Sequence, residues 1–143
     1  MQTFTLPGAA ISFQLPADWR KQRTPPGWRF LAKSSRGAAS LYVNEFPAPM
    51  EGKAFHAHLL AYEKQLARRS DPHARVTTRQ AKVAGEPAFE IVARYGPLTA
   101  YLFAFAHDGR DYVLEYVADA PTLAEAKRVF YASRQSVRFL PAK

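Results

Sequence analysis

The stretch that decides the fold is TAYLFAFAHDGRDYVLEYVA, residues 99–118. Apolar side chains alternate with others on both sides of Asp108-Gly109, a pair that favours the two positive φ values of a type I′ turn. A two-residue turn fixes the register of a hairpin, so the stretch predicts three opposed pairs on one sheet face. These pairs are Phe105 with Tyr112, Phe103 with Leu114, and Tyr101 with Tyr116. Such an aromatic face needs an apolar cover.

A four-stranded meander is predicted around this hairpin, with strands at residues 74–83, 87–95, 99–107 and 110–118. A three-residue loop at Gly96–Leu98 would put Phe89 and Ile91 on the aromatic face. A two-residue loop would instead put Glu90 beside Phe103. Because register follows the buried face, we expect the three-residue loop.

Two helices are predicted to pack on the sheet. Apolar residues at Phe55, Leu59, Tyr62 and Leu66 repeat at helical spacing, which predicts a one-sided helix over residues 54–69. The second helix, over residues 122–138, carries one face with Leu123, Ala126, Phe130, Ser133 and Val137 and is expected to cover Phe89, Ile91, Phe103, Phe105 and Leu114. Thr122 and Glu125 have the spacing of a capping box at its start.

The remaining strands complete an antiparallel sheet. Alternation predicts an N-terminal hairpin from residues 4–6 and 11–15, then strands at 28–32 and 39–46. The length of 143 residues and the apolar content of 48% suit one core. We therefore expect one domain over residues 1–143, of the α+β class, with helices packed on an antiparallel sheet in a three-layer α/β/α arrangement.

The chain is basic, with 20 Lys and Arg against 12 Asp and Glu, a net charge of +8. The excess is spread along the sequence rather than gathered in an arm. One group of cations lies among aromatic residues. Its members are Arg20, Lys21, Arg23, Arg29, Lys33 and Arg36, interleaved with Trp19, Trp28 and Phe30. We expect Trp19 to lie in the core, and a basic nucleic-acid-binding module remains an alternative.

Motifs of common enzymes are absent from the sequence, including G-x-S-x-G, the P-loop, G-x-G-x-x-G and H-E-x-x-H. With the favoured register, Glu90 and Glu115 share a sheet face, and paired carboxylates are the groups that glycosidases use. His56 and His58 lie two apart on a helix, so they point away from each other and cannot share a metal ion. We predict a protein that is not an enzyme, with no cofactor and no metal, and keep a carboxylate-based hydrolase as an alternative.

The sequence as given has no run of apolar residues long enough to span a membrane and no secretion signal at Met1. This predicts a cytoplasmic protein if Met1 is the natural start, and an exported one if a signal segment has been removed. There is no cysteine, which excludes disulfide bonds and leaves the compartment open. Nothing in the sequence indicates an oligomeric state.

Four short motifs lie at the turns and element ends: Leu15-Pro16-x-x-Trp19, Gly85-x-Pro87-Ala88, Asp108-Gly109-Arg110-x-Tyr112-x-Leu114 and Ser136-Val137-Arg138-Phe139. With the order of elements, they resemble the PsbP-like superfamily, which includes Mog-type Ran-binding proteins, PsbP of photosystem II and bacterial DcrB-related proteins. The resemblance implies the fold of that superfamily. The N-terminal part is also similar to Eag-type chaperones, which hold hydrophobic segments of type VI secretion effectors, although Lys21–Thr24 replaces their Asp-x-Ser.

These observations predict a non-enzymatic domain that binds a protein or peptide segment, as an adaptor or chaperone. An amphipathic or transmembrane-like peptide would lie against Val92, Leu102 and Val113, with Trp28 and Arg29 at the rim. The helix over residues 54–69 would cover the same face in the alternative arrangement. The similarity to Eag-type proteins implies a narrower alternative, a cytoplasmic chaperone for type VI effectors.

Overall fold

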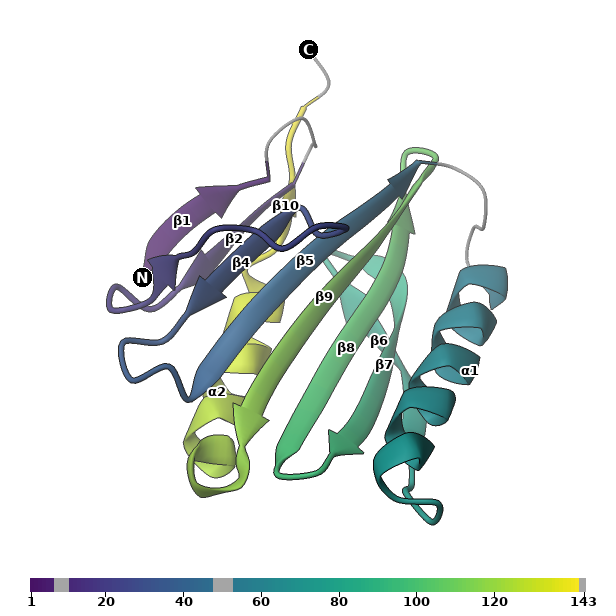
Figure 1. Cartoon of the computed structure of the whole chain (residues 1–143). Coiled ribbons are helices and arrows are strands. Elements are labelled where there is room, and N and C mark those ends of the chain that lie inside the picture. The colour runs from purple at the N-terminus through teal and green to yellow at the C-terminus, as the bar shows by residue number, and fades with distance from the viewer. Residues whose placement is uncertain (7–10, 48–52, 142–143) are drawn as a thin grey trace.

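The computed structural model describes residues 1–6, 11–47 and 53–141 of the chain. Two antiparallel sheets and two helices make up these residues (Figure 1). The larger sheet has the order β3-β4-β5-β9-β8-β7-β6, and the smaller has the order β1-β2-β10. The strands are β1 Gln2–Thr5, β2 Ile11–Leu15, β3 Arg20–Lys21, β4 Phe30–Lys33, β5 Ala39–Pro47, β6 Thr77–Val83, β7 Glu86–Tyr95, β8 Leu98–His107, β9 Arg110–Asp119 and β10 Arg138–Phe139. The helices are α1 Lys53–Ser70 and α2 Leu123–Gln135, with a 3-10 turn at Ala120–Thr122 before α2.

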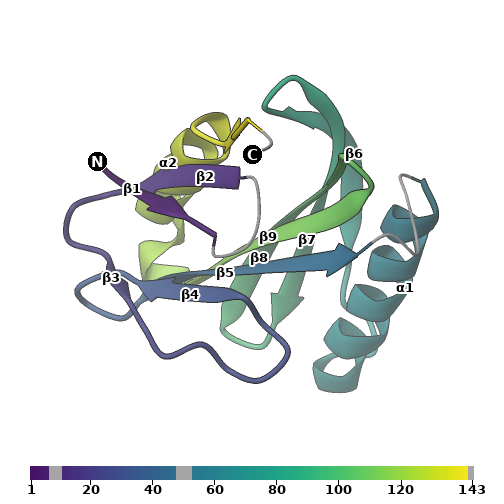
Figure 2. The same ribbon diagram turned by 90° about the horizontal axis from the view of Figure 1, so that it is seen from above.

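The two helices pack on opposite faces of the larger sheet. Seen from above, α2 and the β1-β2 hairpin lie on one side, and α1 lies on the other beside β6 and β7 (Figure 2). Helix α2 contacts β8, β9 and β2, whereas α1 contacts β7. The predicted α+β class, with helices on an antiparallel sheet, is confirmed. The smaller sheet was not predicted, because its third strand, β10, has only two residues.

The main core lies between the larger sheet, α2 and the smaller sheet. The predicted register of the β8-β9 hairpin is confirmed, since Phe103 opposes Leu114 and Phe105 opposes Tyr112. Asp108 and Gly109 have φ values of 51° and 74°, as a type I′ turn requires. Trp19 is 3% exposed and belongs to this core, as expected.

The predicted register of β7 on β8 is wrong by one residue. Tyr95 pairs with Leu98, so the turn contains only Gly96 and Pro97. Gly96 has a φ of 58°, which the first central position of a type II′ turn needs and glycine adopts at little cost. Phe89 and Ile91 therefore oppose Ala104 and Leu102 on the face toward α1, and α2 does not cover them.

The register places Glu90 beside Phe103 on the α2 face, where the carboxylate is 3% exposed. Its charge is compensated by Arg79 of β6, whose Nε lies 2.8 Å from Glu90 Oε1. The Tyr131 hydroxyl of α2 donates to Glu90 Oε2 at 3.0 Å. A buried carboxylate is tolerated where such partners satisfy it, and these partners tie β6 and β7 to α2.

Helix α2 begins without the predicted capping box. The Thr122 hydroxyl donates to Asp119 and makes no cap bond to the helix, while Asp119 Oδ1 accepts from the Thr122 amide at 3.1 Å. The helix also ends at Gln135 rather than at residue 138. Beyond it, Arg138 and Phe139 pair with β2, which joins the C-terminal segment to the N-terminal hairpin.

We expect Phe103→Ala to lower the free energy of unfolding by about 3–5 kcal/mol, because it empties a fully buried site in the main core. Phe89→Ala is the matched control. Phe89 is half-buried and stacks on His56 with a centroid distance of 3.9 Å, so its loss should cost clearly less. Urea denaturation of both variants measures the difference, and equal losses would contradict the observed assignment of faces.

Arg79→Met should destabilise the protein by about 1–3 kcal/mol, because it leaves the buried Glu90 carboxylate with one donor instead of two. Glu90→Gln should cost less, since its amide oxygen still accepts a hydrogen bond and Arg79 is 65% exposed to solvent. Urea unfolding at neutral pH tests the ranking. A Glu90→Gln variant less stable than Arg79→Met would contradict it.

Candidate functional site: a groove beside helix α1

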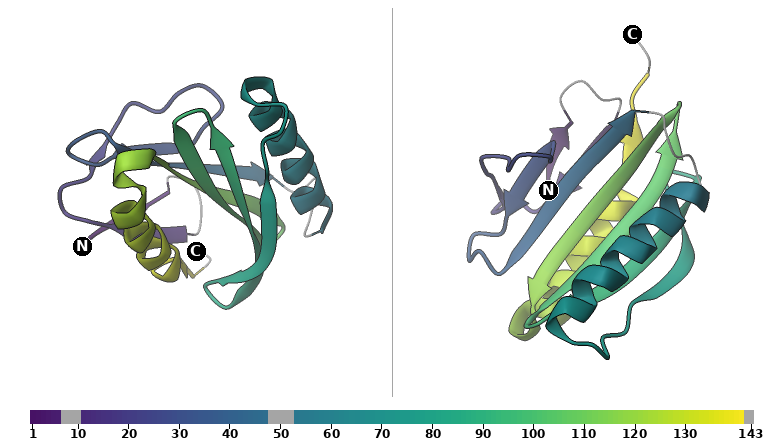
Figure 3. Two further views of the ribbon diagram at one scale, coloured as in Figure 1. Left: turned by 90° about the horizontal axis from the view of Figure 1, so that it is seen from below. Right: turned by 45° about the vertical axis from the view of Figure 1, so that its right-hand side comes forward.

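Helix α1 covers only part of its sheet face. Phe55 and Leu59 pack on Ile91, Leu102 and other apolar residues of β7, β8 and β9. Turned to bring α1 forward, the ribbon shows the helix along the β7 side, with β5 and β9 uncovered on this face of the sheet (Figure 3). Helix α1 therefore covers the β7 side of this face, and the face is open over β5 and β9.

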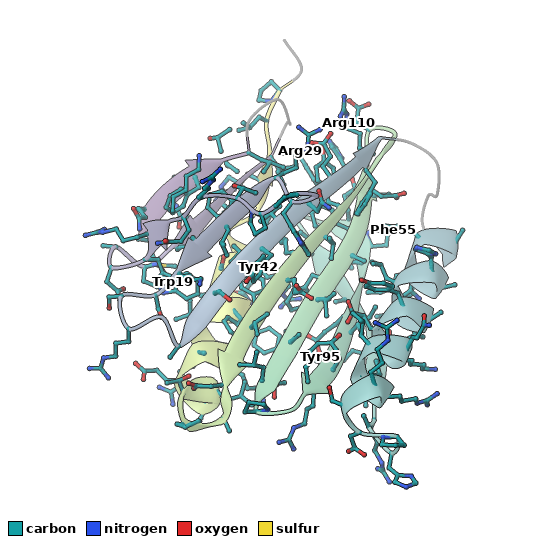
Figure 4. The ribbon with its side chains drawn as sticks, viewed as in Figure 1. Trp19, Arg29, Tyr42, Phe55, Tyr95 and Arg110 are labelled. Atoms are coloured by element: carbon teal, nitrogen blue, oxygen red, sulfur yellow. The ribbon has the colours of Figure 1, made fainter. Side chains whose placement is uncertain are left out.

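A groove runs between α1 and the uncovered strands. We call it the α1–β5 groove, and it holds a cavity of about 430 Å³. Figure 4 labels Phe55 and Tyr42 on its two sides, from α1 and β5. The lining residues on α1 are Phe55, His58, Leu59, Tyr62, Glu63 and Leu66. Those on the sheet are Asn44, Phe46, Leu102, Asp111, Val113 and Glu115.

The floor of the groove follows from strand register. Val113 of β9 opposes Asn44 of β5 on one side and Ala104 of β8 on the other. Two residues along β9, Glu115 opposes Leu102. Ala104 itself is buried in the smaller core with Phe55 and Leu59. The strand register thus gives the groove an apolar floor of Leu102 and Val113, with the acidic residues Asp111 and Glu115 along β9.

The wall opposite α1 is made by Trp28, on the turn before β4. Its ring lies 5.2 Å from that of Tyr42, centroid to centroid. Asn44 Nδ2 donates to the Gly27 carbonyl at 2.6 Å and so holds this turn against β5. A half-buried tryptophan at the edge of an apolar groove is a typical anchor for a partner side chain.

The groove continues along α1 into a second cavity of about 630 Å³. The two cavities share Leu66 and Glu115 in their linings. The second also reaches Tyr42 and Tyr95, and Figure 4 shows Tyr95 at that end of the sheet. Two adjoining cavities along one helix offer room for an extended or helical segment rather than for a single side chain.

The structure brings three of the five predicted contact residues together. Trp28, Leu102 and Val113 line the groove. Val92 lies on the opposite face, packed against the main core, because the register of β7 differs by one residue. Arg29 is exposed and does not line the cavity, although its amide donates to the Val43 carbonyl at 3.0 Å.

Three carboxyl groups line the groove, those of Glu63, Asp111 and Glu115. Glu63 of α1 is 4% exposed. Two causes together raise the pKa of Glu63 to about 8: first its burial, and second the nearby negative charge of Glu115. Burial also raises the pKa of Glu115 to about 7. Both groups can therefore exchange a proton close to neutral pH.

The predicted pairing of Glu90 with Glu115 is wrong, since the two lie on opposite faces of the sheet. The pair that does form, Glu63 with Glu115, was missed because it joins a helix to a strand far away in sequence. One signal was present. Glu63 follows Leu59 by four residues, so it interrupts the apolar stripe of the helix on the side that packs against the sheet.

The histidines of α1 have different surroundings. His56 stacks on Phe89, and its Nε2 lies 2.7 Å from Thr78 Oγ1. His58 is exposed at the edge of the groove. Within residues 1–6, 11–47 and 53–141, no three His, Cys, Asp or Glu side chains gather in a way that could hold a metal ion.

The basic cluster predicted as a nucleic-acid site is solvent-exposed, at Arg20, Lys21, Arg23, Arg29, Lys33 and Arg36. Two of its three interleaved aromatic residues are not exposed with it, because Trp19 is 3% exposed and Phe30 is 1% exposed. Buried rings cannot stack on bases, so Trp28, which is half-buried, is the one interleaved ring that could offer this cluster a stacking surface.

Comparison with known proteins identifies the fold. No family model and no curated protein sequence matches the chain. Among solved structures, PsbP from the cyanobacterium Synechocystis sp. PCC 6803 has 12% identity and a TM-score of 0.73, covering 96% of this chain and 91% of its own. The Ran-binding protein Mog1p of Saccharomyces cerevisiae has 9% identity and a TM-score of 0.64, covering 97% and 95%. LpqN of Mycobacterium tuberculosis, involved in cell envelope biogenesis, has 13% identity and a TM-score of 0.61, covering 98% and 91%.

The chain therefore has the PsbP-like, Mog-type fold, as the resemblance implied. In the described part of the chain, neither helix is both long and apolar enough to cross a membrane.

The raised pKa values predict a stability that depends on pH. An unfolded Glu titrates near 4.5 and the folded Glu63 near 8, so between these values the native state binds more protons than the unfolded chain. The contribution of Glu63 to stability is therefore complete below pH 4.5 and lost as pH rises through 8. Glu63→Gln should remove this loss and make the protein about 1–3 kcal/mol more stable than wild type at pH 8.5.

Urea unfolding of wild type and Glu63→Gln across this pH range checks the expectation. Glu125→Gln, on the exposed side of α2, is the control and should keep the wild-type pH dependence. Parallel curves for wild type and Glu63→Gln would contradict the assignment of Glu63 as a buried titrating group.

Proposed function

We propose that the chain is a protein-binding domain, an adaptor or chaperone, which holds an apolar segment of a partner protein in the α1–β5 groove. One observation carries this proposal: a groove with an apolar floor runs beside α1, bounded by a half-buried tryptophan and an exposed tyrosine. Tyr62 is 52% exposed, and Trp28 and Phe55 lie near it in the same lining. Exposed aromatic residues around an apolar depression are typical of peptide-binding surfaces.

Catalysis is supported less well by the same groove. A carboxylate pair could act in acid-base chemistry, but sugar substrates also need several hydrogen-bonding side chains to orient them. Besides the carboxylate pair, the described lining residues with hydrogen-bonding side chains are Asn44, His58, Tyr62, Asp111 and Trp28, and the Asn44 amide is already bonded to Gly27. The other walls are mainly apolar, which favours a ligand with apolar side chains.

The fold comparison is compatible with a protein partner. Mog1p of yeast is a Ran-binding protein, so one protein of this fold binds another protein. A narrower version of the proposal is a chaperone for hydrophobic segments of type VI effectors, which rests on the similarity of the N-terminal part to Eag-type chaperones. The groove would serve either role, since both need an apolar surface and no catalytic residue.

Binding of a fluorescent leucine-alanine peptide, followed by anisotropy, tests the proposal. Trp28→Ala and Tyr62→Ala should each weaken binding at least about tenfold, because aromatic anchors contribute most of the affinity at such sites. These two residues are only partly buried, so their loss should spare the fold. Leu102 is 2% exposed and would be a poor choice, since its replacement tests folding instead.

Leu140→Ala is the matched control, because Leu140 is 36% exposed and does not line the groove. Its peptide affinity should equal that of wild type. Equal weakening by all three variants would mean non-specific adsorption, and no binding by wild type would contradict the proposal. Binding of a labelled oligonucleotide that is lost with added salt and with Arg29→Ala would support the nucleic-acid alternative instead.

A further inference from the structure

Glu63 is a buried acid without a partner for one of its oxygens. Its side chain lines the groove at 4% exposure, and Oε2 has no hydrogen-bond partner among the described residues. Leu59 and Leu66, one turn away on either side, line the same cavity. A carboxylate in apolar surroundings costs free energy unless it is paired. A site that keeps such a group beside an open groove is suited to a ligand that supplies the missing partner.

More acidic side chains line the same cavity from β9. Glu115 lies close enough to Glu63 to repel its charge, and Asp111 lies farther along the strand. No Lys or Arg is present among the lining residues of this cavity in the described chain. This cavity is thus acidic within a protein whose net charge is +8, so its charge is complementary to a cation. Lys33 and Arg69 line only the second cavity.

We propose that the segment held in the groove carries a lysine or arginine whose cationic head group binds between Glu63 and Glu115. This inference rests on the proposed function and specifies the chemistry of the partner. A lysine or arginine suits the groove because its aliphatic stem can lie along the apolar walls while its head reaches the carboxylates. Hydrogen bonds between ionised partners are the strong ones, and the burial of Glu63 strengthens them.

Two labelled peptides test the inference, identical in their leucine and alanine residues except for one central position. That position is lysine in one peptide and norleucine in the other, which has a similar aliphatic chain without the charge. At about pH 8.5, where both carboxyl groups are largely ionised, wild type should bind the lysine peptide at least about tenfold more tightly. Glu63→Gln with Glu115→Gln should abolish this preference while still binding the norleucine peptide.

Affinity for the lysine peptide should also fall about tenfold between about pH 8.5 and pH 6, because protonation removes the negative charge that attracts the cation. The norleucine peptide should show no such fall. Other titratable or charged groups that face the groove are His58, Tyr62, Asp111, Tyr42, Tyr95, Lys33 and Arg69. His58→Gln is therefore included, and the pH dependence should persist in it.

The outcomes separate this inference from the proposed function. Equal binding of both peptides by wild type would overturn the cation site and leave the peptide groove in place. Absence of binding by either peptide would overturn both. A lysine preference that persists in the double variant would place the cation elsewhere and overturn the inference. Circular dichroism of each variant checks that it is folded. The single Glu63→Gln variant is included as a milder change and should lose most of the preference for the lysine peptide.

Discussion

The β8-β9 hairpin is the part of the structure on which the rest depends. Phe103 and Leu114 point to α2, while Leu102 and Val113 point to α1, so the hairpin forms the centre of both cores. Its type I′ turn leaves no freedom of register, because a slip of one residue would move every aromatic side chain to the other face. Both helices are amphipathic and gain stability only by docking on one of these faces.

The neighbouring strand shows how a local turn and a tertiary contact decide a register together. The Gly96-Pro97 turn is short, and it carries Glu90 to the main core. An isolated glutamate there would be costly, but Arg79 and Tyr131 bond to it from β6 and α2. The same shift gives Ile91 to the α1 face, where it contributes to the smaller core.

The groove exists because α1 covers β7 and β8 but leaves β9 and β5 open. The helix is held at that position by Phe55 and Leu59 in the smaller core and by His56 on Phe89. A helix is about 10 Å wide, so it covers about two strands of a sheet whose strands are 4.8 Å apart. The open face of β5 and β9 is bounded on one side by the turn that carries Trp28 and on the other by α1. Acidic side chains line the groove from both α1 and β9.

Residue patterns determined the local elements, both helices, the β8-β9 register and the class of fold, since periodicity and turn chemistry act over a few residues. Sequence reasoning also singled out Trp28, Leu102 and Val113, which the structure places in the lining of the groove. It failed to predict which face of the sheet Val92 lies on. Val92 and Glu90 share a face, and the partners that allow Glu90 to be buried there lie 11 and 41 residues away in the sequence. It failed for Glu63 for the same reason. Glu63 becomes a buried acid, with no hydrogen-bond partner for Oε2 among the described residues, only when α1 docks on the sheet beside β9. That placement is a property of tertiary packing alone.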